Sequence, residues 1–183
     1  LLENFFIRIL RGSGLKGLVS FGKKSKFEEK NLLRPLLDQK KEDLLFLSKY
    51  VFNFFVEDPS NINEKYQRTQ IRELIKQLQK KGLDKVKFFK TINNLKSSNE
   101  VVDFYVEENF KKNTFFSSSR NKLVLNRTFF QQPYEIVFRG LSKSIRFVGG
   151  RYYSVRGKKL DKIIGIMENN SNLKVTLGRC IIE

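Results

Sequence analysis

The sequence predicts a chain that begins as an α/β layer domain and continues as a mainly helical region. In residues 1–60, helical apolar patterns alternate with short runs rich in Leu, Val and Phe, which is the signature of an α/β layer. In residues 61–183 most apolar residues recur at helical spacing. The 183 residues include 40% hydrophobic and 30% charged side chains, as in a folded globular chain. We therefore place a boundary at residue 61.

The first sixty residues contain helices, turns and short strands in alternation. Apolar residues at helical spacing predict a helix over 2–10, and Gly12-Ser13-Gly14 should stop it. Residues 15–18 then read as a tight turn. Further along the chain we expect a basic loop over 23–30, a short strand over 33–37, a helix over about 40–50 with Asp38 as its N-cap, and a buried strand over 51–56.

The later residues contain mostly helices. Asn61 and Glu64 have capping-box spacing for a helix that carries an apolar stripe over 71–78, and Gly82 stands where a C-terminal cap belongs. We expect helical structure from 83 to about 112, a loop over 117–119, an irregular hairpin or strand over 122–130, and helices over about 133–148 and 160–167.

The chain is strongly basic, and its excess charge grows along the sequence. The formal charge is +17, divided as +3 over residues 1–60, +6 over 61–120 and +8 over 121–183. A basic surface for a polyanion such as RNA would produce this imbalance. Alternatively, the charge reflects compositional drift, since an AT-rich genome favours codons for Lys, Asn, Phe and Ile. The gradient favours a basic surface in the second half, since uniform drift would spread the charge evenly.

The sequence lacks the residue types that several classes of catalytic and metal site require. The sequence has no His, which excludes an imidazole base, a Ser-His-Asp triad and a His metal ligand within these residues. Cys180 is the only cysteine, so an internal disulfide, a CxxC pair and a Cys-based zinc site are excluded, and we assign no metal-ligating residue in this chain. We read Cys180 as a small buried residue. We expect a cytoplasmic protein without a membrane segment or a signal peptide.

The two ends of the chain do not resemble natural termini. Leu1 is not a Met and already lies inside a helical pattern, and the chain ends on the apolar run 180–182 followed by Glu183. We therefore expect a piece of a longer protein.

Two stretches of the sequence differ from generic helix and loop. The first is Glu3-Asn4-x3-Arg8-x2-Arg11-Gly12-Ser13-Gly14-x2-Gly17-Leu18. The second is Arg34-Pro35-Leu36-Leu37 followed by Glu57-Asp58-Pro59-Ser60-Asn61-x4-Tyr66-x-Arg68-x3-Arg72. Taken singly, each has a plain explanation as a helix stop, a turn with a cap, or a solvated basic face.

Together, and in this order, the two stretches resemble the tRNA(Ile)-lysidine synthetases of the PP-loop ATP pyrophosphatase superfamily. The family pattern runs from an Asp-Asp-x-x-Glu-Thr helix into Arg-Gly-Ser-Gly-x-x-Gly-Leu, then through Arg-Pro-Leu-Leu to Asp-Pro-Ser/Thr-Asn and Tyr-x-Arg-x3-Arg. Here Glu3 matches the motif Glu, and Asn4 replaces the usual Thr. The resemblance is close over residues 1–80 and looser beyond. It implies the C-terminal part of a Rossmann-like adenine-nucleotide-binding domain, followed by a mostly helical tRNA-binding region.

The resemblance also implies an activity. Enzymes of this family ligate lysine to C2 of the wobble cytidine of isoleucine tRNA with a CAU anticodon. ATP first adenylates the cytidine, pyrophosphate leaves, and the lysine amine displaces AMP to form lysidine. The implied partners are isoleucine tRNA, L-lysine and ATP with Mg²⁺. The family's Ser-Gly-Gly-x-Asp-Ser phosphate loop and its Asp pair are not in these 183 residues, so we expect this chain alone to be inactive.

The matching residues suggest roles. By this resemblance, Glu3 is an acid on the lysine or cytidine side, and Arg68 is an active-site cation, which suits a cationic amine and a polyanionic RNA. Arg8, Arg11 and Arg72 are candidates for anion contacts or for bridging the Asp58 turn. The remaining motif residues are expected to shape loops: Gly12, Ser13, Gly14, Asp58 and Asn61.

Two other functions stay open. A tRNA thiolase uses related ATP chemistry but relies on paired cysteines, which Cys180 alone does not supply. A non-catalytic basic RNA-binding module would bind RNA with an affinity that depends on salt concentration but not on ATP or lysine. A membrane-surface helix is less favoured, because the basic residues are interspersed with Phe and Leu in compact elements.

Overall fold

A computed structural model describes residues 2–20, 22, 24–27, 30–56, 67–150, 155–168 and 174–183. They form two compact units, Leu1–Asn99 and Glu100–Glu183, and the division falls inside helix α5 (Lys85–Asn113). The boundary expected at residue 61 lies outside the described residues. None of the described helices is long and apolar enough to cross a membrane.

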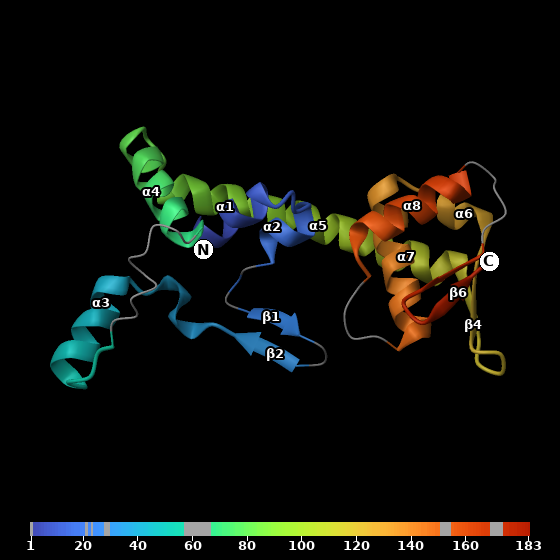
Figure 1. Cartoon of the computed structure of the whole chain (residues 1–183), viewed down its shortest axis with the longest axis horizontal. Helices are drawn as coiled ribbons and strands as arrows, with labels where there is room; N and C mark the ends of the chain where they lie inside the picture. The colour runs from blue at the N-terminus through green and yellow to red at the C-terminus, as the bar shows by residue number, and fades with distance from the viewer. Residues whose placement is uncertain are drawn as a thin grey trace. The chain divides into compact units, whose positions relative to one another are not determined.

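The first unit is built from helices and one small hairpin (Figure 1). Helix α1 (Leu2–Leu10) is followed by the short helix α2 (Leu15–Val19), where the sequence predicted only a turn. Strands β1 (Lys24–Phe27) and β2 (Lys30–Leu33) pair antiparallel where a loop was expected. The later elements of the unit are the 3-10 turn η1 (Pro35–Asp38), α3 (Lys41–Phe46), the π-helical turn η2 (Leu47–Val51), α4 (Gln67–Lys80) and the first part of α5.

Two helices of this unit end in the same way, at the glycines that the sequence marks. Gly12 after α1 has φ +66°, and Gly82 after α4 has φ +102°. Behind them the Ser13 amide donates to the Arg8 carbonyl and the Leu83 amide donates to the Leu78 carbonyl, both at 2.9 Å. These are Schellman motifs, in which glycine adopts the left-handed conformation without a Cβ penalty. The predicted helix stops are confirmed.

The core of the first unit lies between α1 and α4. Ile7 is buried against Ile71 and Ile75, and Leu2 and Phe6 pack around them. Ile9 and Leu10 of the same helix are apolar but exposed, and Ile7 is its buried residue. The ring of Phe88 from α5 packs against those of Phe5 and Phe6 on α1, so α1 contacts α5 as well as α4.

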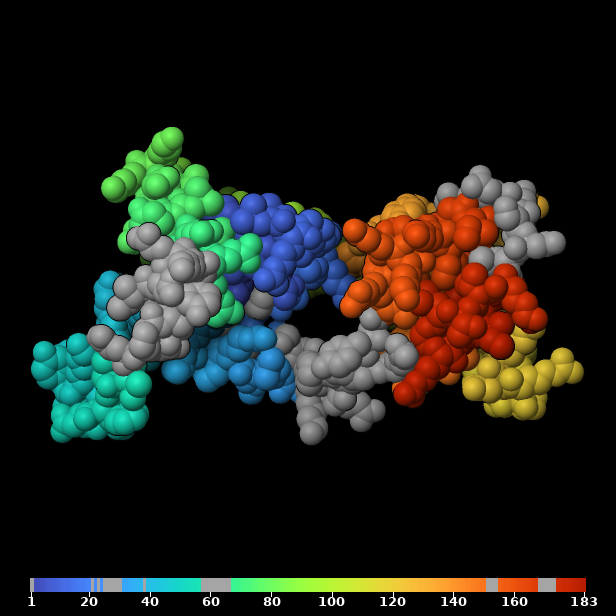
Figure 2. Space-filling model, in the orientation of Figure 1, coloured from blue at the N-terminus to red at the C-terminus, as the bar shows by residue number. Residues whose placement is uncertain are grey.

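The predicted strands over 33–37 and 51–56 do not form. Residues 35–38 make η1, and the chain from 52 to 56 has no regular structure. The N-cap of α3 is Lys40, without a side-chain hydrogen bond, so the expectation that Asp38 caps this helix was wrong. Apolar side chains over 46–56 are exposed instead of buried, among them Phe52 and Phe54 at 72% each. In Figure 2 the teal atoms of this segment are in open view.

The second unit surrounds one helix, α7 (Tyr134–Gly149), with Pro133 at its N-cap. Before it come β3 (Thr114–Ser117) and β4 (Lys122–Leu125), an antiparallel hairpin, and the short helix α6 (Arg127–Phe130). After it come α8 (Gly157–Glu168) and a second antiparallel hairpin, β5 (Val175–Leu177) with β6 (Cys180–Ile182). The predicted helices over 83–112, 133–148 and 160–167 are confirmed, whereas the terminal hairpin was not predicted.

The core of this unit gathers apolar residues from α6, α7, α8 and the last hairpin. Phe129 is fully buried and its ring lies against Gly140, where a Cβ would come within 2.8 Å of Phe129 Cζ. Leu141 and Leu160 are exposed by only 2% and 1%. Cys180 is buried in the same core and its thiol donates to the Ile145 carbonyl at 3.3 Å, as expected for a structural cysteine.

A line of asparagines fixes the end of α5 to α6. The Asn113 amide donates to Asn109 Oδ1 at 2.7 Å, and the Asn126 amide donates to Asn113 Oδ1 at 3.1 Å. Asn126 also caps α6 by accepting from the Phe129 amide, while the buried Asn109 donates to the Phe129 carbonyl. Because buried polar groups are costly when unpaired, these hydrogen bonds fix where α6 begins.

Candidate functional site

The motif residues that the structure describes gather where α1 meets α4. Glu3, in the first turn of α1, accepts a hydrogen bond from Arg72 Nε at 2.9 Å. Arg11, just beyond the other end of α1, reaches Gln67 at the start of α4, with 3.5 Å between Nη2 and Oε1. Since the order of the contacts reverses between the helices, α1 and α4 are antiparallel. Glu3 and Arg72, 69 positions apart in sequence, thus form an ion pair.

Arg68 lies on the same side of α4 as the residues that contact α1. It precedes Ile71, Arg72 and Ile75 by three, four and seven positions, which places all four on one face of a helix. Unlike the two isoleucines, Arg68 is exposed. Its guanidinium is therefore an accessible cation one turn from the Glu3–Arg72 pair.

Arg8 is directed elsewhere, towards α2. Its Nη1 donates to the Gly17 carbonyl and to the Ser20 hydroxyl, and that hydroxyl donates to the same carbonyl at 3.1 Å. Partial burial, and then the nearby Arg11 cation, lower the pKa of Arg8 below its ordinary value. A guanidinium keeps its proton at neutral pH in proteins, so Arg8 remains a cation that links the end of α1 to the α2 turn.

The Gly-Ser-Gly turn is closely packed against Gly17. A Cβ at Gly17 would lie 3.0 Å from Ser13 Cβ and 3.9 Å from Arg8 Nη1, whereas Cβ atoms at Gly12 or Gly14 would meet nothing within 4 Å. Gly12 is needed for its positive φ. Gly17 is needed for close approach. The sequence pattern included Gly17 but gave no reason to single it out, and Ser20 and Gln67 carried no motif signal.

The remaining predicted residues, Asp58 and Asn61, lie outside the described residues. The structure thus brings together Glu3 and Arg72, places Arg68 one turn away on α4 and Arg11 at the other end of α1 against Gln67, and turns Arg8 away to α2. One carboxylate and the three guanidiniums of Arg11, Arg68 and Arg72 make a cationic α1–α4 face that can bind a phosphate or a carboxylate. Within the described residues no three acidic, His or Cys side chains lie close enough to hold a metal ion.

Comparison with known proteins finds similar sequences. Residues 1–78 match the PP-loop domain family. Over 182 residues, or 99% of this chain, the chain is 29% identical to a tRNA(Ile)-lysidine synthase of Wolbachia pipientis wMel, of which it covers 42%. It is 28% identical over 154 residues to the synthase of Anaplasma marginale. Identity to that of Orientia tsutsugamushi rises to 42% over 80 residues, or 43% of this chain.

These matches extend over both units. The chain spans 42% of the length of its Wolbachia relative. Because the PP-loop match ends at residue 78, it includes α1 and most of α4 and therefore every described residue of the site. This chain is therefore similar in sequence to tRNA(Ile)-lysidine synthases along almost its whole length, and its residues 1–78 match the PP-loop domain family.

Proposed function

We propose that this chain is part of an enzyme that ligates L-lysine to C2 of the wobble cytidine of isoleucine tRNA with a CAU anticodon. The reaction consumes ATP through an adenylated cytidine and releases pyrophosphate and then AMP. The observation that carries the proposal is the Glu3–Arg72 pair, because it joins the two motif stretches into one site within the part matched by the PP-loop domain.

Each residue has a part in this proposal. Glu3 holds the ammonium group of the incoming lysine or orients the cytidine, and Arg72 fixes the carboxylate of Glu3 by its hydrogen bond. Arg68 is exposed and faces the same region, so it is the cation that meets the phosphate of the adenylated cytidine. Arg11 adds positive charge beside Gln67. Arg8 acts as a support for the turn that contains Gly12, Ser13 and Gly14.

The residues that would hold the ATP phosphates are not in this sequence, since no Ser-Gly-Gly-x-Asp-Ser occurs in its 183 residues. We therefore assign this chain only the lysine and cytidine side of the reaction. Asp58 and Asn61 stay assigned to shaping the loop before α4, and Mg²⁺ to the family's ATP chemistry.

The test is incorporation of labelled lysine into a tRNA(Ile) transcript with a CAU anticodon. The protein that contains this chain together with an ATP phosphate loop should incorporate lysine, and the isolated 183 residues should not. A transcript with uridine at the wobble position is the control and should stay unlabelled. Failure of the complete protein to incorporate lysine would sink the proposal, and incorporation by the isolated chain would refute its division of the site.

The basic second half is proposed to contact the body of the tRNA. Its charge of +8 over residues 121–183 includes Lys158, Lys159 and Lys162, which lie on α8 and are exposed. Reversing all three to Glu should weaken tRNA binding by the complete enzyme and lower its salt dependence, because phosphate contacts release counterions. Unchanged binding would remove α8 from the tRNA interface.

A further inference from the structure

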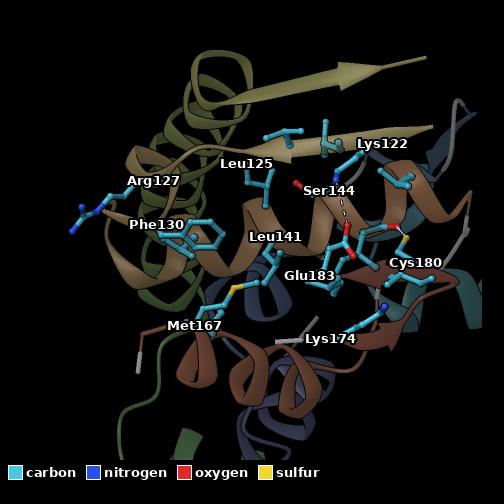
Figure 3. A pocket seen from close by; sticks show the side chains of 18 of the residues that line it. Lys122, Leu125, Arg127, Phe130, Leu141, Ser144, Met167, Lys174, Cys180 and Glu183 are labelled. Atoms are coloured by element: carbon cyan, nitrogen blue, oxygen red, sulfur yellow. Dashed lines mark hydrogen bonds and ion pairs between the residues drawn. The ribbon is translucent and has the colours of Figure 1, made fainter. Parts of the chain in front are cut away.

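The second unit contains an open cavity of about 1800 Å³ that none of the roles above uses. Its walls come from the β3–β4 hairpin, α7, α8 and the β5–β6 hairpin, and Figure 3 shows it from close by. Apolar side chains line the middle: Leu125, Phe130, Leu141 and Met167 are gathered there in Figure 3. We call this cavity the hairpin groove.

The rim of the hairpin groove is cationic. Five basic residues line the hairpin groove: Arg120, Lys122, Arg127, Lys174 and Arg179. Glu183 is the one acidic residue among its described lining residues. The Lys122 ammonium lies 3.3 Å from Glu183 Oε1, and the two side chains remain 53% and 58% exposed. An exposed ion pair of this kind contributes little to stability, so an anion from solution can replace the carboxylate.

One side of the rim is held rigidly. Gly178 and Arg179 form the β5–β6 turn with φ +63° and +68°, the angles of a type I′ hairpin. A Cβ on Gly178 would lie 2.4 Å from Ile145 Cγ2, and one on Gly149 would lie 2.1 Å from the Gly178 carbonyl oxygen. The turn is therefore pressed against α7, and it carries an arginine where Asn or Gly would adopt this backbone more easily.

From this arrangement we propose that the hairpin groove binds a single-stranded segment of RNA, with unpaired bases on the apolar floor and phosphates on the cationic rim. This inference rests on the proposed function, in which the polyanion that the protein binds is RNA. A single strand presents the apolar faces of its unpaired bases as well as the charge of its phosphates, and a groove that is both apolar and cationic suits it better than a duplex. A phosphate oxygen takes the place of Glu183 beside Lys122.

The rim is tested by the salt dependence of binding. The 183-residue chain is titrated against a labelled single-stranded 12-nucleotide RNA, and fluorescence anisotropy is measured at several salt concentrations. Lys174→Gln should reduce the slope of log affinity against log salt by about 0.7, the value for one phosphate contact on a single strand. Lys80→Gln, which removes the same charge from an exposed position in the first unit, should leave the slope unchanged.

Two further variants test the floor and the ion pair. Met167→Gln makes the floor polar without changing charge, and it should weaken single-strand binding by about fivefold with an unaltered salt slope. Glu183→Gln removes the carboxylate that competes for Lys122, and it should strengthen binding by about twofold or more.

The outcomes separate this inference from the proposed function. Equal affinity for a duplex of the same length, or for polyglutamate, would overturn the inference. So would single-strand binding that the Lys174, Met167 and Glu183 variants leave unchanged but that reversal of Lys158, Lys159 and Lys162 abolishes. In that case lysine incorporation by the complete protein would still stand, because its test does not depend on the hairpin groove.

Discussion

The Glu3–Arg72 ion pair orients the two side chains more than it stabilises the folded chain. The two side chains are 37% and 35% exposed, so solvent screens their attraction. A double-mutant cycle with Glu3→Gln and Arg72→Gln in the 183-residue chain should give a coupling free energy of about 0.3–1 kcal/mol by urea unfolding. A coupling of several kcal/mol would instead make the pair a structural element and weaken its assignment to the site.

Arg68 should affect chemistry without affecting folding. Since its side chain is exposed, Arg68→Gln should change the free energy of unfolding by less than about 0.5 kcal/mol. Lysine incorporation by the complete protein should fall by about a hundredfold, the usual effect of removing one group that stabilises developing charge. Lys76→Gln, on the same helix and ion-paired with Glu73, is the matched control and should retain activity. Equal activity of the two variants would contradict the role given to Arg68.

At these single positions the sequence was informative only in part. The motifs identified Glu3, Arg68 and Arg72, but the 69-residue separation of the ion pair gave no hint that Arg72 would be neutralised by Glu3 while Arg68 stays exposed. Arg8 looked equivalent to Arg11. Its contacts to Gly17 and Ser20 depend on α2, which the pattern had read as a turn.

In the turn of the last hairpin, substitution of one of the two residues should destabilise the protein, whereas substitution of the other should be tolerated. Gly178→Ala adds a methyl group 2.4 Å from Ile145 at a positive φ, so we expect a loss of about 2–5 kcal/mol in the free energy of unfolding. Arg179→Asn, at φ +68° in the same turn, should be neutral or slightly stabilising. Thermal unfolding of both variants tests this difference. Equal losses of stability would contradict the packing of Gly178 on α7.

Helices were predictable from the sequence because their signals are local. Gly12 and Gly82 act within one turn of their helices, and the long α5 needs only its own periodicity. Strands depend on distant partners. The run 51–56 has the composition of a buried strand, but a strand needs neighbours for its backbone hydrogen bonds, and in the described residues it pairs with none.

The three hairpins of the described residues were not predicted, or were predicted only in part, because their strands are short and their turns carry no clear sequence signal. Strands β5 and β6 are three residues each, too short for alternation to be visible, and their turn uses Arg179 instead of the Asn-Gly pair that announces a type I′ hairpin. The hairpin exists because its turn fits against Ile145 and Gly149 of α7. This contact between distant parts of the chain is not visible in a local pattern.

For the whole chain, the exposed apolar segment 46–56 of the first unit should control solubility. Two of its Phe rings are 72% exposed, and the segment adds Tyr50 and Val56 at 73% and 69%. The 183-residue chain should therefore self-associate with rising concentration, as seen by light scattering, and Phe52→Ser with Phe54→Ser should reduce this. Phe115→Ser, at an exposed ring of the second unit, is the control and should have little effect. Monodisperse behaviour of the unaltered chain at all concentrations would contradict this prediction.

The close contact between Gly149 and Gly178 also constrains how this protein can evolve. Since a Cβ at either position would meet the other residue's backbone or Ile145, neither glycine can change alone while the hairpin stays in place. A lineage that acquires a side chain at one of them must also move the turn, and Arg179 moves with it. Substitutions at 149 and 178 should therefore appear together among relatives, accompanied by a new location for the positive charge now carried by Arg179.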